Sequence, residues 1–137
     1  MDGEPLRAAR TAATLLLVAP IVLTAVAAAV PLEPATGSLT APAALIGLVA
    51  PAIGFHIYRR IQEAPGVDRP ARFVRATVLA LACTEAAATL GVVAFLLSRR
   101  PEGLIGLVMH VLLAGAVWPS RDRFETFVGG PGGGTDA

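Results

Sequence analysis

The chain has 137 residues, of which 55% are hydrophobic and only 15% are charged. Ordinary soluble domains carry about 25% charged residues, so a soluble domain of this composition would lack a charged surface. All 11 basic residues are Arg, and the net charge of +1 argues against the basic face that nucleic-acid binding requires. The composition therefore predicts a multi-pass protein of the lipid bilayer with no nucleic-acid partner.

Apolar runs along the chain predict the transmembrane helices. A helix of roughly 20 residues crosses the ~30 Å hydrocarbon layer, and a backbone in lipid must be helical because lipid offers no partner to a free N–H or C=O. The four expected spans are residues 12–30, 42–58, 74–97 and 104–118. The predicted fold is an all-α bundle of four transmembrane helices in one domain, residues 1–127, followed by a disordered Gly-rich tail at 128–137.

The first span has an alternative interpretation as a secretory signal, because Arg7 and Arg10 precede its apolar core. The run is long, however, and the segment AVAAAV, which resembles an A-x-A cleavage site, passes straight into PLEP. These features favour a retained helix over a cleaved signal.

The distribution of Arg predicts the orientation in the membrane. With both termini inside, nine Arg are cytoplasmic, and only Arg99 and Arg100 are not. The positive-inside rule therefore places both termini in the cytoplasm and the protein in the cytoplasmic (inner) membrane. Tyr58 and Trp118 end the second and fourth spans on the same side. Aromatic side chains gather at membrane–water interfaces, so both are predicted to be interface anchors.

The pentapeptide LIGLV occurs at residues 45–49 and again at 104–108, and each copy opens an even-numbered span. Two tandem helical hairpins of the same orientation would give this pattern. Pro51 would then be equivalent to His110, and Pro20 would lie opposite Glu85. The alternative is coincidence, because these are the commonest residues of membrane helices.

A single carboxylic acid, Glu85, lies at the centre of the third span. A charged acid at that depth costs ~2.5–3.5 kcal/mol on insertion scales, so we expect Glu85 to be protonated or paired with a partner. Such a group can bind a proton or a small cation. Cys83, Ala87 and Gly91 recur every four residues and form a small-residue ridge, which lets another helix approach closely. The alternative is an acid that only fixes helix packing.

His110 is the predicted partner of Glu85 within the chain. It lies about 12 Å from the cytoplasmic end of its span, against about 16 Å for Glu85, at 1.5 Å per residue. The two side chains would meet if the third and fourth spans packed as an antiparallel hairpin. The alternative is that His110 donates to a backbone carbonyl or a Thr of the bundle and does nothing more.

A motif surrounds Glu85. A polar loop that contains Arg comes first and ends at Arg75. An L-A-x-x-E-A pattern follows, and a G-hydrophobic-V pattern comes after it. These two patterns are formed by Leu81, Ala82, Glu85 and Ala86, and by Gly91 and Val93. Residues 70–97 thereby resemble the second helix of the rotary ATP synthase c subunits. The resemblance implies that Glu85 carries H⁺ or Na⁺. The chain departs from that family in two ways: its preceding helix has only Gly47 and Gly54 in place of repeated G-x-G, and a further helix flanks the hairpin on each side.

Enzyme chemistry is disfavoured by the motifs. There is no HExxH, no GxSxG, no Gly-rich phosphate loop and no second membrane acid, and the single Cys83 allows no internal disulfide. No cofactor and no metal are expected. The sequence predicts a proton-linked, proteolipid-like or accessory membrane subunit that works as a homo-oligomer or with partner membrane subunits. The alternative is a structural or interaction protein without ion chemistry.

Overall fold

The computed structural model of the chain describes residues 3–31, 39–65 and 68–129. These residues form helices joined by short connections, and no strand occurs among them. The elements in chain order are α1 (Gly3–Ala29), α2 (Thr40–Glu63), α3 (Arg69–Ser98), the 3-10 turn η1 (Pro101–Leu104), α4 (Ile105–Val117) and α5 (Arg121–Val128). The predicted all-α fold class is confirmed.

The helices extend past the apolar runs at their charged ends. α1 begins at Gly3 instead of residue 12, and α2 continues to Glu63 instead of ending at residue 58. α3 already begins at Arg69, because the Asp68 side chain accepts a hydrogen bond from the Ala71 N–H at 3.0 Å and caps the first turn. Most of the polar segment expected between the second and third spans is therefore helical.

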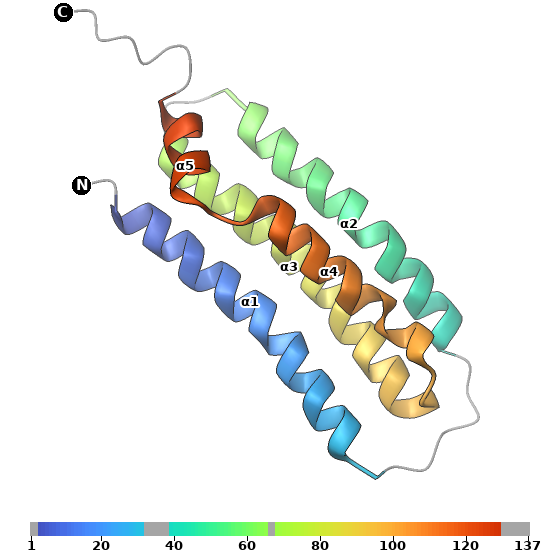
Figure 1. Cartoon of the computed structure of the whole chain (residues 1–137). Helices are drawn as coiled ribbons and strands as arrows, with labels where there is room; N and C mark the ends of the chain where they lie inside the picture. The colour runs from blue at the N-terminus through green and yellow to red at the C-terminus, as the bar shows by residue number, and fades with distance from the viewer. Residues whose placement is uncertain (1–2, 32–38, 66–67, 130–137) are drawn as a thin grey trace, which may run out of the picture.

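α3 lies at the centre of the bundle (Figure 1). It packs against α1, α2 and α4, and successive long helices run in opposite directions (Figure 1). α3, η1 and α4 form a packed antiparallel hairpin. α1 and α2 do not pack as a hairpin, because α3 and α4 lie between them (Figure 1). Of the two tandem hairpins suggested by the repeat, only the second is a packed pair.

The two copies of LIGLV nevertheless lie against each other. A Cβ on Gly47 would lie 2.6 Å from the Cα of Gly106, which holds the same place in the second copy. A Cβ on Gly106 would lie 2.8 Å from the carbonyl oxygen of Ala87 on α3. One turn further along α3, a Cβ on Gly91 would lie 2.2 Å from the carbonyl oxygen of Gly103. α2, α3 and α4 therefore meet backbone to backbone, which only residues without a side chain permit.

The bundle is apolar on the outside as well as inside. Many large apolar side chains point outward along the helices, and Leu15, Leu45 and Leu112 are each more than 60% exposed. Contiguous exposure of this kind is rare in soluble proteins. α1, α2 and α3 are each long and apolar enough to cross a membrane, whereas Pro101–Val117 qualifies only together with α5 as a pair bent by 56°. These features are compatible with a membrane protein.

α5 was not expected from the sequence. Ser120 caps it by accepting a hydrogen bond from the Arg123 N–H at 3.3 Å. The Phe124 ring packs edge-on against Phe73 at 5.3 Å between ring centroids, next to Leu6 of α1. The helix therefore covers one end of the bundle with its apolar face. Of the predicted tail at 128–137, Val128 ends α5, and residues 130–137 lie outside the described part of the chain.

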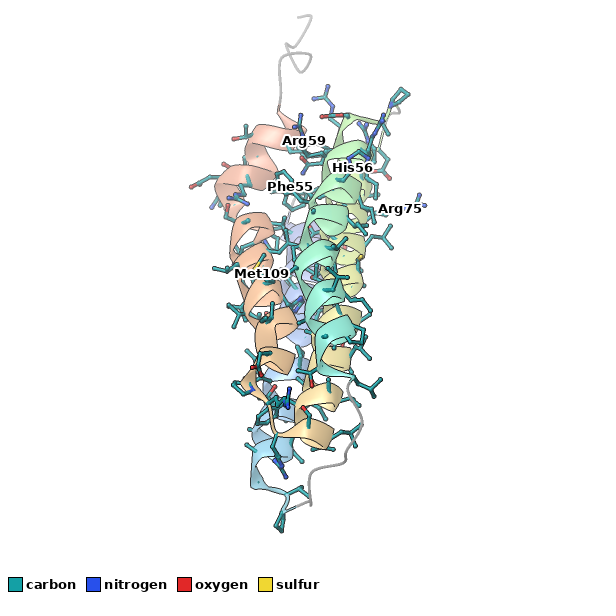
Figure 2. All side chains as sticks on the ribbon, turned by 90° about the vertical axis from the view of Figure 1, so that its right-hand side faces the viewer. Phe55, His56, Arg59, Arg75 and Met109 are labelled. Atoms are coloured by element: carbon teal, nitrogen blue, oxygen red, sulfur yellow. The ribbon has the colours of Figure 1, made fainter. Side chains whose placement is uncertain are left out.

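The two ends of the bundle differ in charge. Nine of the 11 Arg belong to the end that holds the start of α1, the α2–α3 connection and α5 (Figure 1). Figure 2 shows Arg59 and Arg75 toward this end, with Met109 nearer the middle of α4. Arg99 and Arg100 follow α3 at the opposite end. We call the first of these the Arg-rich end.

Arg side chains also pair with backbone carbonyls that helix ends leave free. The last four carbonyls of a helix have no partner within it. The Arg99 side chain donates to the carbonyl oxygen of Ala27, in the last turn of α1, at 2.9 Å. It also donates to the carbonyl oxygen of Val30, the residue that follows the helix. The further donations run from Arg72 to Ala64 after α2, from Arg123 to Ala116 in α4, and from Arg69 to Val128 in α5. Each of these bonds joins one element of the bundle to another or to its own connection.

Gly106→Ala tests the backbone contacts against a matched control. We expect it to lower the free energy of unfolding in detergent by about 1–3 kcal/mol, because a new methyl group must displace the backbone of α3. Gly115→Ala lies in the same helix, and a Cβ there meets nothing within 4 Å, so it is expected to be neutral or stabilising. Denaturant titration followed by circular dichroism measures both, and equal effects would contradict the packing described above.

Candidate functional site

A proline inside α1 creates an unpaired backbone carbonyl. Pro20 lies in the interior of the helix and has no N–H. In an α-helix the N–H of residue i pairs with the carbonyl of residue i−4, so the carbonyl of Leu16 loses its partner. The His110 Nε2 lies 3.0 Å from this oxygen. A carbonyl only accepts hydrogen bonds, so Nε2 carries the hydrogen and donates it.

The other ring nitrogen of His110 contacts α3. Nδ1 lies 2.7 Å from the hydroxyl oxygen of Thr84, and both side chains are fully buried. In the neutral ring Nε2 holds the single hydrogen, so Nδ1 accepts from the Thr84 hydroxyl. His110 thus joins α1, α3 and α4 through two hydrogen bonds. We call His110, Thr84 and the Leu16 carbonyl the His110 junction.

The His110 junction has hydrogen-bond partners for two protonation states. The Thr84 oxygen also lies 3.1 Å from the carbonyl oxygen of Leu81. If Nδ1 gains a proton, it donates to Thr84, and the Thr84 hydroxyl hydrogen turns to Leu81. Every polar group stays paired in either state. The junction is therefore able to hold or release a proton without losing a hydrogen bond.

Glu85 lies beside this junction and not within it. It follows Thr84 on α3 and is partly buried. Its Oε1 accepts a hydrogen bond from the Thr89 hydroxyl at 3.3 Å. In the described chain Glu85 forms no ion pair, and its interaction with His110 is electrostatic, without a hydrogen bond between them. The predicted Glu85–His110 pair is thus separated, and Thr84 holds the place next to the ring.

The contacts of His110 are those of the alternative considered for it from the sequence, a backbone carbonyl and a Thr. The sequence did not predict that the carbonyl of Leu16 would be the acceptor for His110. Pro20 was the available signal, because a proline within a helix frees the carbonyl four residues earlier. No sequence pattern indicated that His110 would reach that carbonyl from another helix.

The predicted small-residue ridge is divided between two surroundings. Ala87 and Gly91 are buried where α3 meets η1 and α4. Cys83 is only partly buried and lines an outward-facing apolar groove of about 540 Å³ between α2 and α3, together with Leu45 and Val49. Only part of the ridge therefore serves packing within one chain.

The predicted interface anchors both contact the interior. Tyr58 is 8% exposed and belongs to the apolar cluster that includes Leu81 and Val117. Trp118 packs against the same cluster and is partly buried. Both residues lie toward the Arg-rich end, and their role at a membrane surface stays a prediction.

The described residues contain no group of three or more His, Cys, Asp or Glu side chains that could hold a metal ion. His110 is the one titratable side chain that is fully buried among the described residues.

Comparison with the models of known protein families, with curated proteins and with solved structures finds no match. The functional interpretation therefore rests on the residues of this chain. Among them, His110 and Glu85 are titratable groups that lie away from both ends of the bundle.

Pro20→Ala tests the His110 junction by rescue. His110→Leu leaves the Leu16 carbonyl unpaired, and we expect a loss of about 1–3 kcal/mol in unfolding free energy. The Thr84 hydroxyl does not lose its hydrogen bond in this variant, because the carbonyl oxygen of Leu81 remains as its acceptor. With Ala at position 20 a backbone N–H returns to Leu16, so His110→Leu should cost about 1 kcal/mol less in that background.

The control for this cycle is Pro51→Ala, a helix-interior proline of α2. It should leave the cost of His110→Leu unchanged, because Pro51 frees a carbonyl of a different helix. Denaturant titration in detergent measures all variants. Equal costs of His110→Leu with Pro20 and with Ala at position 20 would show that Leu16 is not its partner in solution.

Proposed function

We propose that the chain crosses the cytoplasmic membrane four times, with η1 and α4 as the fourth span. Residues Pro101–Val117 extend ~28 Å when the four residues of η1 rise ~2.0 Å each and those of α4 rise 1.5 Å each, close to the ~30 Å hydrocarbon layer. α5 carries four charged residues in eight, so it does not continue the span. Its apolar face packs on the bundle, which suits a helix at the membrane surface.

The Arg-rich end is the cytoplasmic end in this proposal. Its support is the gathering of nine Arg on one side of an otherwise apolar bundle. The start of α1 and the end of α5 lie on this side (Figure 1). Both termini are then cytoplasmic.

The proposed function is proton-linked and centred on Glu85. The observation that carries it is a carboxyl at the middle of α3 with no basic side chain bonded to it in the described chain. Surroundings of low dielectric favour the neutral acid unless a cation balances its charge. Glu85 therefore exchanges a proton or meets a group supplied by another chain. The resemblance of residues 70–97 to rotary c subunits points to the same residue.

The partial burial of Glu85 supports work in an assembly. An acid sealed inside one chain would be shut off from partners, whereas Glu85 lies at the rim of the buried face of α3. We propose a proteolipid-like or accessory subunit that binds copies of itself or other membrane subunits. The two glycines that α2 has in place of the repeated G-x-G of that family, Gly47 and Gly54, contact α4 and α3 of the same chain, so a ring like that of c subunits is not part of the proposal.

A purely structural role is the second candidate, and one observation favours it. The His110 junction is fully hydrogen-bonded and joins three helices, as expected of a group that only stabilises a bundle. In that case Glu85 would fix contacts with another subunit and carry no proton.

Dicyclohexylcarbodiimide separates the two candidates, because it modifies protonated carboxyl groups in apolar surroundings. We expect labelling of Glu85 in native membranes that weakens as the pH rises, since deprotonation removes the reactive form. Glu63, which is exposed and paired with Arg59 at 2.9 Å, is the internal control and should stay unlabelled. Mass spectrometry of peptides assigns the site. Absence of labelling at any pH, with normal assembly of Glu85→Gln, would favour the structural role.

Cysteine labelling tests the orientation independently. In a Cys83→Ala background, Thr126→Cys on α5 and Glu102→Cys on η1 place one exposed thiol at each end of the bundle. A membrane-impermeant maleimide added to intact cells should label position 102 and leave position 126 unlabelled until the membrane is opened. The reverse labelling pattern would indicate the opposite orientation in the membrane. Labelling of both positions before lysis would argue against the proposed four-span insertion.

A further inference from the structure

A hollow at the Arg-rich end has the features of an anion site. It measures about 710 Å³ and is lined by residues from the first turns of α1 and from α5. Volumes of about 300–1,000 Å³ are typical of ligand pockets. The guanidinium groups of Arg7, Arg10 and Arg121 line it, and Glu125 is the one acid among its lining residues. We call it the α1–α5 pocket.

The charges of this pocket are incompletely balanced. Glu125 is bound to Arg121 at 2.6 Å, so its charge is already matched. Arg10 uses its Nε to donate to the Pro119 carbonyl at 3.0 Å, and its two terminal nitrogens remain. Arg7 makes no hydrogen bond and no ion pair within the described chain. Two guanidinium groups therefore have free donors, which suit the oxygens of a phosphate group.

The floor of the α1–α5 pocket is apolar. Leu6, Phe124 and Val128 line it together with the Arg side chains, and Leu6 and Phe124 belong to one buried cluster. A soluble anion gains nothing from such a surface. A molecule with a phosphate group at one end and apolar chains at the other fits both parts of the lining.

The position of the pocket indicates that the molecule with a phosphate group and apolar chains is a membrane lipid. Arg10 is about one turn and a half from Leu15, which begins the exposed apolar stretch of α1. In the membrane placement proposed above, on which this inference rests, the pocket lies at the headgroup level of the cytoplasmic leaflet. Anionic lipids of that leaflet attract basic side chains near the surface, and basic pockets beside transmembrane helices bind their head groups.

We propose that the α1–α5 pocket binds the phosphate head group of an anionic phospholipid of the cytoplasmic leaflet. Arg7 and Arg10 contact the phosphate, and the apolar floor contacts the glycerol and the upper acyl chains. The bound lipid joins α1 to α5, two elements that the described chain connects through the cluster around Phe124, while Arg10 of α1 bonds to Pro119 just before α5.

Native mass spectrometry of the full chain released from detergent tests this proposal. Phosphatidylglycerol and phosphatidylcholine are added in equal amounts, and we expect phosphatidylglycerol to be retained in preference. Arg7→Gln should lower its apparent affinity about fivefold, as expected for the loss of one basic side chain near an anionic head group. Arg60→Gln is the matched control, because Arg60 is an exposed Arg of the same end that does not line the pocket. It should leave the affinity unchanged.

Several outcomes would overturn the assignment. Equal retention of the two lipids would contradict the proposed site. The same affinity of the wild-type chain and of Arg7→Gln for phosphatidylglycerol would contradict it too. Displacement of phosphatidylglycerol by inorganic phosphate would show a site for soluble anions and not for lipid. Alkaline carbonate extraction distinguishes failure of the site from failure of the proposed function. If the chain stays in the membrane pellet but shows no lipid preference, only the lipid site is ruled out. If carbonate extracts the chain from the membrane, the proposed membrane placement is ruled out as well.

Discussion

Backbone carbonyls without a helical partner are the constraint on which this structure depends. In lipid an unpaired carbonyl costs several kcal/mol, and the chain creates such groups at its helix ends and at Pro20. His110 donates to the carbonyl that Pro20 leaves free, that of Leu16. Arg side chains meet those at the ends, including Arg99 for α1 and Arg72 after α2. The polar side chains of an otherwise apolar protein therefore serve mainly to complete the backbone.

This use of Arg changes the meaning of the charge distribution. A simple count treats each Arg as a signal of orientation, yet Arg69, Arg72, Arg99 and Arg123 also donate to carbonyls at helix ends. Their positions are constrained by the fold as well as by topology. Arg7, at the start of α1, makes no such bond within the described residues, so its position is not constrained in this way.

The sequence could predict what depends on the positions of the apolar runs, but it could not predict which helices pair. Apolar runs located the helices, and the central position of Glu85 on α3 followed from spacing alone. The start of α1 at Gly3 was missed because a hydropathy pattern ends at the lipid boundary, whereas hydrogen bonding within a helix continues past it. The bond from His110 to Leu16 was missed because it joins residues 94 positions apart, and nothing in local sequence encodes which helices meet.

Thr84 and Glu85 show how the site combines two surroundings on one helix. Consecutive residues of an α-helix point about 100° apart, so Thr84 is fully buried against His110 while Glu85 lies at the partly exposed rim. A change of charge at Glu85 acts on His110 through space, without any movement of α3. Thr84 offers the ring of His110 a hydrogen-bond partner in both of its protonation states. The Leu16 carbonyl accepts from the Nε2 of His110 in either state, so the link between α4 and α1 is the same whichever state the ring holds.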